Sequence, residues 1–318
     1  MEHHFEPEVY RQHFGIDSNE DIAFAEEVLQ ALQKIDRALV PRSYTHPYME
    51  QIRAGHTAVD GLLEALDAPI EGTTTADVLD ALSYIYLNEE ISTAASQKIQ
   101  GYLGDEDLAP IAARCLAIGR DHSFLLNTME GLSSDDPGVV ASAAMLMGYG
   151  RFEEAVPVLL PLLSPLRFVE SRSVIWALGE IGSEEAIPRL TRALSEHFRP
   201  VDCLISLGKI GAITSLGALT PHVMGGAREL RETALKSLSM ILSKQNDLTF
   251  LAPLRESMEG LLTQIATEDP SNTARFYALL SLSRLGVKWK QNQLRRSLNM
   301  SLPEEQIDAF ANFYLRKR

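Results

Sequence analysis

The sequence lacks most of the signals that identify enzymes, zinc domains and membrane-spanning chains. Its two cysteines, Cys115 and Cys203, form no pair at the spacing of a zinc site or a redox motif. No glycine-rich phosphate loop and no G-x-S-x-G turn occurs. No apolar run approaches the ~18 residues needed to cross a bilayer. Because nothing in the sequence argues for catalysis, we favour a non-catalytic role.

Targeting and metal-binding signals are missing as well. The first fifteen residues, MEHHFEPEVYRQHFG, are polar and acidic, without the charged and apolar segments of a secretory signal. Three histidines (His3, His4 and His13) stand among glutamates there, but no second cluster in helical register completes a ligand shell. We therefore expect a polar terminus with no metal site. Both cysteines are expected to be buried thiols in a cytoplasmic protein that needs no cofactor.

Negative charge predominates and is unevenly distributed. The formal net charge is -14, and residues 1–110 hold 21 acidic against 6 basic residues, a balance of -15. Residues 271–318 hold 3 acidic against 9 basic residues, a balance of +6. An acidic protein repels nucleic acid at long range, which disfavours a nucleic-acid-binding function. The basic cluster Lys288, Lys290, Arg295 and Arg296 is either a solvated helix face or a docking patch for an acidic partner or for the acidic N-terminal region.

An internal repeat is the strongest positive feature of the chain. The segment EEAVPVLLPLL (153–163) recurs as EEAIPRLTRAL (184–194), 31 residues later, with six of eleven positions identical. Self-similarity at a period of about 20–50 residues is typical of solenoids, which mostly bind other macromolecules. Repeat residues predict the architecture, but they do not identify the partner.

The helix that precedes each copy carries a second regularity, in which a small residue is followed four positions later by a large apolar one. The large residue recurs at intervals of 31, 31, 29, 31 and 44 residues. Residues four apart share one helix face, so each pair is expected to be buried between neighbouring repeats. We call these twelve residues the ladder: Ala112/Leu116, Ala143/Met147, Val174/Leu178, Cys203/Leu207, Ala234/Leu238 and Ala278/Leu282.

Glycine and proline support the same register. Gly119, Gly182, Gly211 and Gly286 follow the ladder helices, where glycine adopts a left-handed conformation at little cost. Pro157 and Pro188 fall at matching positions near the start of the next helix, where a missing N–H is harmless. Each unit is therefore predicted to be a helix, a short turn and a second helix.

The line SRSVIWALGEIGSEEAIPRLTRAL (171–194) resembles the HEAT-like repeat of the phycobilin lyase type, also called the E-Z type. The resemblance is good over about 137–211 and looser over 105–136 and 212–290. It implies an all-α fold, a HEAT-like right-handed α-solenoid of stacked antiparallel helix pairs. We divide the chain into an N-terminal helical cap or module (1–104), the repeat solenoid (105–290) and a basic C-terminal capping helix (291–318).

The same resemblance leaves several functions open. Similar repeats occur in chromophore lyase subunits, in a metal-dependent hydroxylase and in many adaptors. The hydroxylase carries paired His-Glu dipeptides as iron ligands, and this sequence contains no His-Glu dipeptide. We favour a cytoplasmic scaffold or adaptor for another protein, with a bilin-lyase-like subunit as the alternative and a nucleic-acid-binding protein as the disfavoured third.

The first hundred residues have helical patterning without the repeat's glycine and proline marks. We expect helices over about 19–40 and 49–66, and a third helix that begins near Thr75 as its N-cap. Terminal repeats are usually atypical, because one face must meet water. Farther along, Asp121 and His122 are expected to be ordinary loop residues.

Candidate partner-binding residues follow from outward positions on the ladder helices. They are Arg172, Trp176, Glu180, Lys209, Arg231, Lys236, Arg275 and Arg284. Trp176 stands where the repeat usually has a charged residue, and an exposed tryptophan is a typical binding anchor. The alternative for Trp176 is packing beneath an adjacent loop, and for the arginines it is pairing with a carboxylate of a neighbouring unit.

Overall fold

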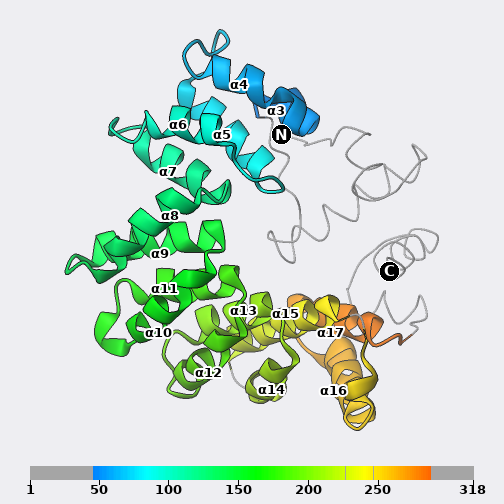
Figure 1. Ribbon diagram of the computed structural model, residues 1–318. Coiled ribbons are helices and arrows are strands. Elements are labelled where there is room, and N and C mark those ends of the chain that lie inside the picture. The colour runs from blue at the N-terminus through cyan, green and yellow to red at the C-terminus, as the bar shows by residue number, and fades with distance from the viewer. Residues whose placement is uncertain (1–45, 226, 246, 288–318) are drawn as a thin grey trace, which may run out of the picture. The chain divides into compact units, whose positions relative to one another are not determined.

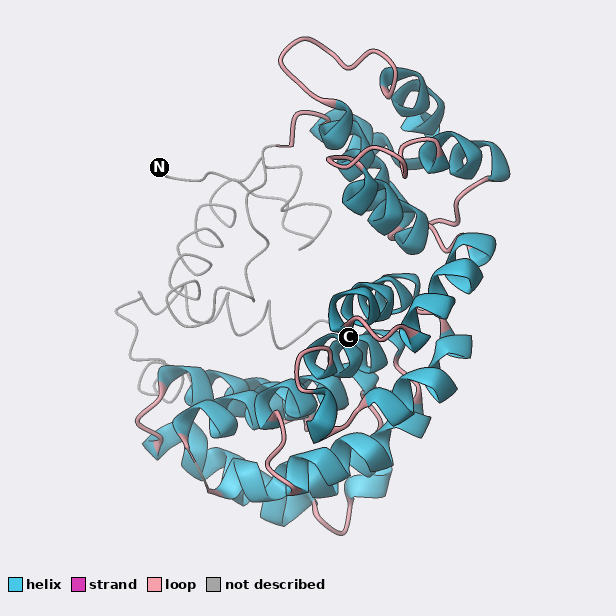
Figure 2. Ribbon diagram, turned by 90° about the vertical axis from the view of Figure 1, so that its left-hand side faces the viewer, coloured by secondary structure: helices cyan, strands magenta, loops and turns pink. Residues whose placement is uncertain are grey.

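The computed structural model describes residues 46–225, 227–245 and 247–287, and all regular structure in these ranges is helical (Figures 1 and 2). Backbone contacts divide the chain between Ala212 and Ile213. We therefore describe residues 46–212, the first unit, separately from residues 213–287, the second unit. The predicted helix over 19–40, the terminal histidines and the basic cluster of Lys288, Lys290, Arg295 and Arg296 lie outside the described residues.

The first unit is a stack of helix pairs. Its helices are α3 (Met49–Ala54), α4 (Val59–Ala65), α5 (Thr75–Tyr86), α6 (Thr93–Gln100), α7 (Ala109–Ile118), α8 (His122–Met129), α9 (Pro137–Gly150), α10 (Val156–Leu162), α11 (Ser171–Ile181), α12 (Ile187–Ser195) and α13 (Pro200–Ile210). Helices α5, α7, α9, α11 and α13 pack against one another in chain order, as Figure 1 shows. Helices α6, α8, α10 and α12 each pack on the odd-numbered helix that follows. This arrangement is an all-α, HEAT-like solenoid.

The second unit continues the alternation with longer helices. It contains α14 (Leu216–Met224), α15 (Arg228–Lys244), α16 (Arg255–Glu268) and α17 (Asn272–Arg284). Helix α15 packs against α14 and α17, and α17 also packs against α16. Among the described helices of both units, none combines the length and the apolar character that a membrane span requires.

Burial confirms the predicted ladder. All twelve residues lie in helices, and each side chain is at most 5% exposed. The ladder helices are α7, α9, α11, α13, α15 and α17. Because each ladder pair faces the neighbouring repeats, the core is a continuous strip along each unit and not a single central cluster.

The start of the first unit differs from the sequence prediction in two places. The helix predicted over 49–66 is broken at Gly55, whose φ of 60° ends α3 before a short 3₁₀ turn, Gly55–Ala58, leads into α4. The N-cap of α5 is Thr74, one residue before the predicted Thr75, and Asp77 completes a capping box with it. Buried apolar residues from Tyr48 to Leu116 form one cluster.

All four predicted glycines follow the end of a ladder helix, and three of them adopt the predicted left-handed conformation. Gly182, Gly211 and Gly286 have φ values of 81°, 79° and 80°, in the left-handed region. Gly119 has a φ of -71°, and Arg120 takes the left-handed conformation in its place. Gly119 is required for a different reason, because a Cβ there would lie 2.8 Å from the Cβ of Ile91.

Candidate functional site

An open groove of about 590 Å³ crosses α9, α11 and α13 in the first unit. The three helices are consecutive ladder helices, and each contributes side chains spaced three or four residues apart, so that one face of each helix borders the groove. The groove is lined by Met145, Tyr149, Arg172, Ser173, Trp176, Asp202, Ile205, Ser206 and Lys209. Four of the predicted partner-binding residues belong to this region: Arg172, Trp176 and Lys209 line the groove, and Glu180 pairs with Lys209.

Trp176 is the centre of this surface. Its ring meets Tyr149 edge to face at 5.0 Å between centroids, and the Lys209 ammonium lies 5.5 Å from the indole centroid. The indole also rests on α9, because a Cβ added to Gly148 would lie 2.5 Å from its Cζ3 atom. Trp176 is therefore half-buried, and it packs on the preceding ladder helix instead of beneath a loop.

A second, smaller hollow lies on the other side of the aromatic pair. It has a volume of about 210 Å³ and is lined by Leu87, Ile118, Arg120, Gly148, Tyr149, Arg151, Trp176 and Glu180. Trp176 and Tyr149 border both hollows, so the two rings stand between them. A ligand that followed the ladder helices across this face would contact both rings.

Ion pairs between α11 and α13 form the polar rim. Lys209 donates to Glu180, and the Arg172 guanidinium lies 3.7 Å from Asp202. Arg199 lies 3.6 Å from the other oxygen of Asp202. Arg172 remains the most accessible of these charges, with its side chain 75% exposed. These ion pairs determine the charge pattern of the rim, and the Arg172 pair, which is exposed on the arginine side, contributes little to stability.

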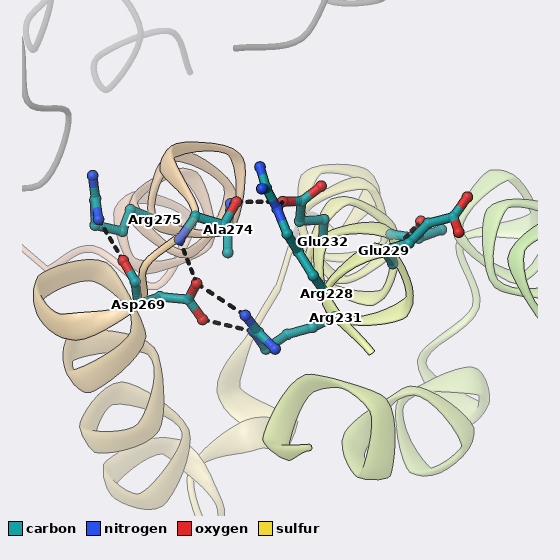
Figure 3. A network of polar contacts seen from close by, with 9 residues as sticks. Arg228, Glu229, Arg231, Glu232, Asp269, Ala274 and Arg275 are labelled. Atoms are coloured by element: carbon teal, nitrogen blue, oxygen red, sulfur yellow. Dashed lines mark hydrogen bonds and ion pairs between the residues drawn. The ribbon is translucent and has the colours of Figure 1, made fainter. Parts of the chain in front are cut away.

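The other four predicted residues lie in the second unit, where two of them hold a loop. The Arg231 guanidinium binds both carboxylate oxygens of Asp269, at 2.6 and 3.1 Å, and Arg275 donates to the Asp269 carbonyl (Figure 3). Asp269 also accepts a hydrogen bond from the Ser271 backbone N–H at 2.8 Å. The side chains of Arg231 and Asp269 are 17% and 7% exposed, so this pair links α15 to the loop before α17. For Arg231 this is the carboxylate pairing that the sequence left open.

The positions of the last two predicted residues, Lys236 and Arg284, do not indicate a binding surface. The Lys236 ammonium lies 5.9 Å from the centroid of the Tyr277 ring, which packs it against α17. Arg284 is in the last turn of α17, where a positive charge favours the helix dipole. Neither residue lines the groove of the first unit.

Sequence reasoning missed Met145, Tyr149 and Ile205. Met145 and Ile205 stand two residues before the large ladder residue, in the same repeat position as Trp176. Tyr149 stands two residues after it, in the same position as Glu180 and Lys209. Comparing these two repeat positions across all copies would have found the three residues.

The prediction that Asp121 and His122 are loop residues is wrong for His122, and Asp121, which precedes the helix, has a capping role that was not predicted. Helix α8 begins at His122, and Asp121 is its N-cap, accepting a hydrogen bond from the Phe124 N–H at 3.0 Å. Burial acts to raise the pKa of Asp121, but hydrogen bonds from Ser96, from Gln100 and from backbone N–H groups outweigh it and hold the pKa below its usual range. Asp121 thus links α6 to α8 through its side chain.

Both cysteines are buried free thiols, as predicted. Burial raises the pKa of each to about 12, so Cys115 and Cys203 stay protonated and pack as small apolar residues. Within the described ranges, no three His, Cys, Asp or Glu side chains gather closely enough to hold a metal ion.

The comparison with protein families agrees with the repeat assignment. The family model for HEAT repeats matches residues 125–202. The complex of CpcE and CpcF of phycocyanin lyase from Nostoc sp. PCC7120 is similar at 19% identity and a TM-score of 0.42, over 79% of this chain and 94% of that one. An engineered protein is similar at 16% identity and a TM-score of 0.40, over 89% of this chain and 79% of that one. The comparison with curated proteins gave no match. Residues 125–202 therefore match HEAT repeats, and the buried ladder of the α-solenoid extends to both sides of them.

Proposed function

We propose that this protein is a non-catalytic scaffold that binds a segment of another protein in the groove of α9, α11 and α13. The observation that carries the proposal is the half-buried aromatic pair of Trp176 and Tyr149, bordered by ion pairs. Tryptophan, tyrosine and arginine are the residues most enriched in binding hot spots, and a polar ring around them is the usual arrangement. The two buried, unpaired thiols suit a reducing compartment, and we place the scaffold in the cytoplasm.

The groove's dimensions suit a peptide segment. Packed helices lie ~8–10 Å apart, so three ladder helices span roughly 20 Å. An extended strand rises ~3.3 Å per residue, and about six residues would cross the groove. Met145 and Ile205 stand on either side of Trp176 in the same repeat position, and together they offer the segment apolar contacts on all three helices.

The charges of the rim predict that the bound segment carries an acidic residue. Lys209 and Glu180 neutralise each other, whereas Arg172 is largely exposed and only loosely paired with Asp202. A carboxylate of the partner would therefore find Arg172 available for a bidentate contact. We expect an apolar or aromatic residue of the partner to sit beside Trp176, with an acidic residue close to it in sequence.

The proposal is tested by comparing two variants of the full chain, one with a substitution in the groove and one with a substitution on α8. Ile205→Glu places a charge in the groove, and Leu126→Glu places one on α8, where Leu126 is 44% exposed and lies outside the groove. Proteins captured from the native cell by the wild-type chain should be lost with Ile205→Glu and kept with Leu126→Glu. Equal capture by both variants, at equal thermal stability, would remove the groove as the binding site.

A second candidate function is a bilin-lyase-like subunit. It is supported by the resemblance of the 171–194 repeat to the phycobilin lyase type, and by an aromatic surface next to the exposed Arg172 guanidinium. Those groups could stack on a planar tetrapyrrole and pair with its carboxylates. Titration with a free bilin distinguishes the two functions, since a shift in visible absorption that Trp176→Ala abolishes would favour the lyase-like role.

A further inference from the structure

A separate apolar groove lies in the second unit between α14 and α16. It has a volume of about 250 Å³, and Leu238 of α15 contributes to its lining. Apart from Thr220 and Ser257, all its lining residues are apolar, and none carries a charge: Leu216, Leu219, Val223, Met224, Leu238, Leu254, Met258, Leu261 and Leu262. A cavity of this composition accepts aliphatic or aromatic side chains and offers little to a charged ligand.

Two apolar residues at the edges of the groove are largely exposed. Met224, at the end of α14, is 68% exposed, and Leu254, just before α16, is 59% exposed. Single exposed apolar residues are ordinary, but two that border the same apolar groove form a continuous patch. Such a patch indicates a surface that another segment covers.

The described chain ends near the first turn of α16, which also contributes to this groove. Arg255, in the first turn of α16, donates to the carbonyl oxygen of Leu285, and Gly286, with a φ of 80°, turns the chain at that point. The same turn of α16 brings Ser257 and Met258 into the groove. The described chain therefore ends near the first turn of α16, and fourteen residues, 288–301, could extend over roughly 45 Å.

The sequence that follows has the pattern of an amphipathic helix. Ser301 and Glu304 match the capping-box spacing S-x-x-E. Ile307, Phe310 and Tyr314 then recur at three- and four-residue intervals on one face. A helix over 302–315 would be about 21 Å long, which is the length of α16.

We propose that residues 302–315 form a helix that docks its apolar face into the groove between α14 and α16. The uncharged lining matches that face, and the length of chain left after Val287 is sufficient to reach it. Glu256 and Glu268 are exposed near the two ends of α16. The basic end of the tail (316–318) would thus meet a glutamate in either orientation of the helix. The docked tail would serve as the C-terminal cap of the solenoid.

Methionine oxidation in the full chain tests the docking without any change to the groove. Met224 is more exposed in the described structure than Met145 of α9, at 68% against 39%, so in the absence of a cover it should react faster with hydrogen peroxide. If the tail covers the groove, Met224 should be oxidised several-fold more slowly than Met145. Phe310→Asp, on the apolar face of the tail, should raise the Met224 rate at least fivefold. Asn312→Asp, on the opposite face, is the matched control and should leave the rate unchanged.

Each other outcome contradicts the proposal. Rapid oxidation of Met224 in the wild-type chain would show that the groove is open. Protection that disappears on dilution would assign the groove to a second copy of the chain. Protection that survives Phe310→Asp but is lost in Leu32→Asp would assign it to the predicted helix over 19–40.

Discussion

Gly179 of α11 lies in direct contact with Ser206 of α13. A Cβ added to Gly179 would come within 2.7 Å of the Ser206 Oγ atom and 2.9 Å of its Cα atom. The Ser206 hydroxyl, in turn, donates to the Ile175 carbonyl of α11 at 2.8 Å. Two consecutive repeats are therefore held at a distance that only glycine permits at this position.

Substitution of Gly179 by alanine should separate α11 from α13. The added methyl meets backbone as well as side chain, so we expect a loss of about 1–3 kcal/mol in the free energy of unfolding. Gly260→Ala in α16 is the control, because its Cβ would meet nothing within 4 Å and the alanine should stabilise that helix by ~0.5–1 kcal/mol. Urea denaturation followed by circular dichroism measures both. Equal stability of the two variants would show that α11 and α13 are not closely packed.

Removal of a ladder side chain should destabilise the repeats around it. Leu178 is fully buried in α11, and large-to-small changes in a core cost ~2–5 kcal/mol. Because repeats couple mainly to their neighbours, Leu178→Ala should reduce hydrogen-exchange protection most strongly over 137–211. Undiminished protection across those residues would show that the ladder register is wrong.

Loss of the Arg231–Asp269 pair should destabilise the second unit. Both side chains are largely buried, and removal of one partner of such a pair costs ~3–5 kcal/mol because it leaves the other charge uncompensated. Arg231→Met should therefore reduce hydrogen-exchange protection in α15 and α17. Arg228→Met is a matched control on the same helix, since its pair with Glu232 is exposed on the arginine side and should contribute less than about 1 kcal/mol. If the two variants behave alike, the pair does not hold the loop at Asp269.

Asp121 should make stability depend on pH. Its pKa in the folded protein lies below its usual range, so the stabilisation is fully present above the unfolded value of ~3.9 and is lost as the pH falls through the folded value. Ser96→Ala removes one of the hydrogen bonds that lower the pKa, and it should move the Asp121 titration, followed by NMR, to higher pH. An unchanged titration in Ser96→Ala would remove Ser96 from this account.

The two thiols should be unreactive in the folded protein. With pKa values of about 12 and no solvent access, Cys115 and Cys203 should resist a thiol reagent at pH 8 and react fully in denaturant. Stoichiometric labelling of the native chain within minutes would mean that the helices carrying them open readily.

The sequence predicted best those features that depend on a single helix, namely which residues are buried and where the helix ends. The ladder was predicted because a buried stripe repeats every three to four residues within a single helix, and every ladder residue is buried. Helix ends at Gly182 and Gly211 followed from the same local rules. Gly55 was overlooked because a glycine inside a helical pattern gives no sign of its φ value.

The groove was less predictable, because it depends on contacts between repeats. Trp176 was identified as unusual, but its contacts with Gly148 and Tyr149 come from the preceding helix and depend on how closely α9 approaches. The role of Arg231 was hidden for the same reason, since Asp269 is 38 residues away in the sequence. Such contacts require the spacing and rotation between helices, which a single sequence does not provide.

Site-specific photo-crosslinking most directly tests the central claim that the groove of α9, α11 and α13 binds another protein. A photoreactive phenylalanine analogue would replace Ser173, which lines the groove, or Leu126 on α8, which does not. After irradiation in the native cell, the account predicts a discrete protein adduct from position 173 and none from position 126. Adducts from position 126 alone, or equally from both positions, would contradict it.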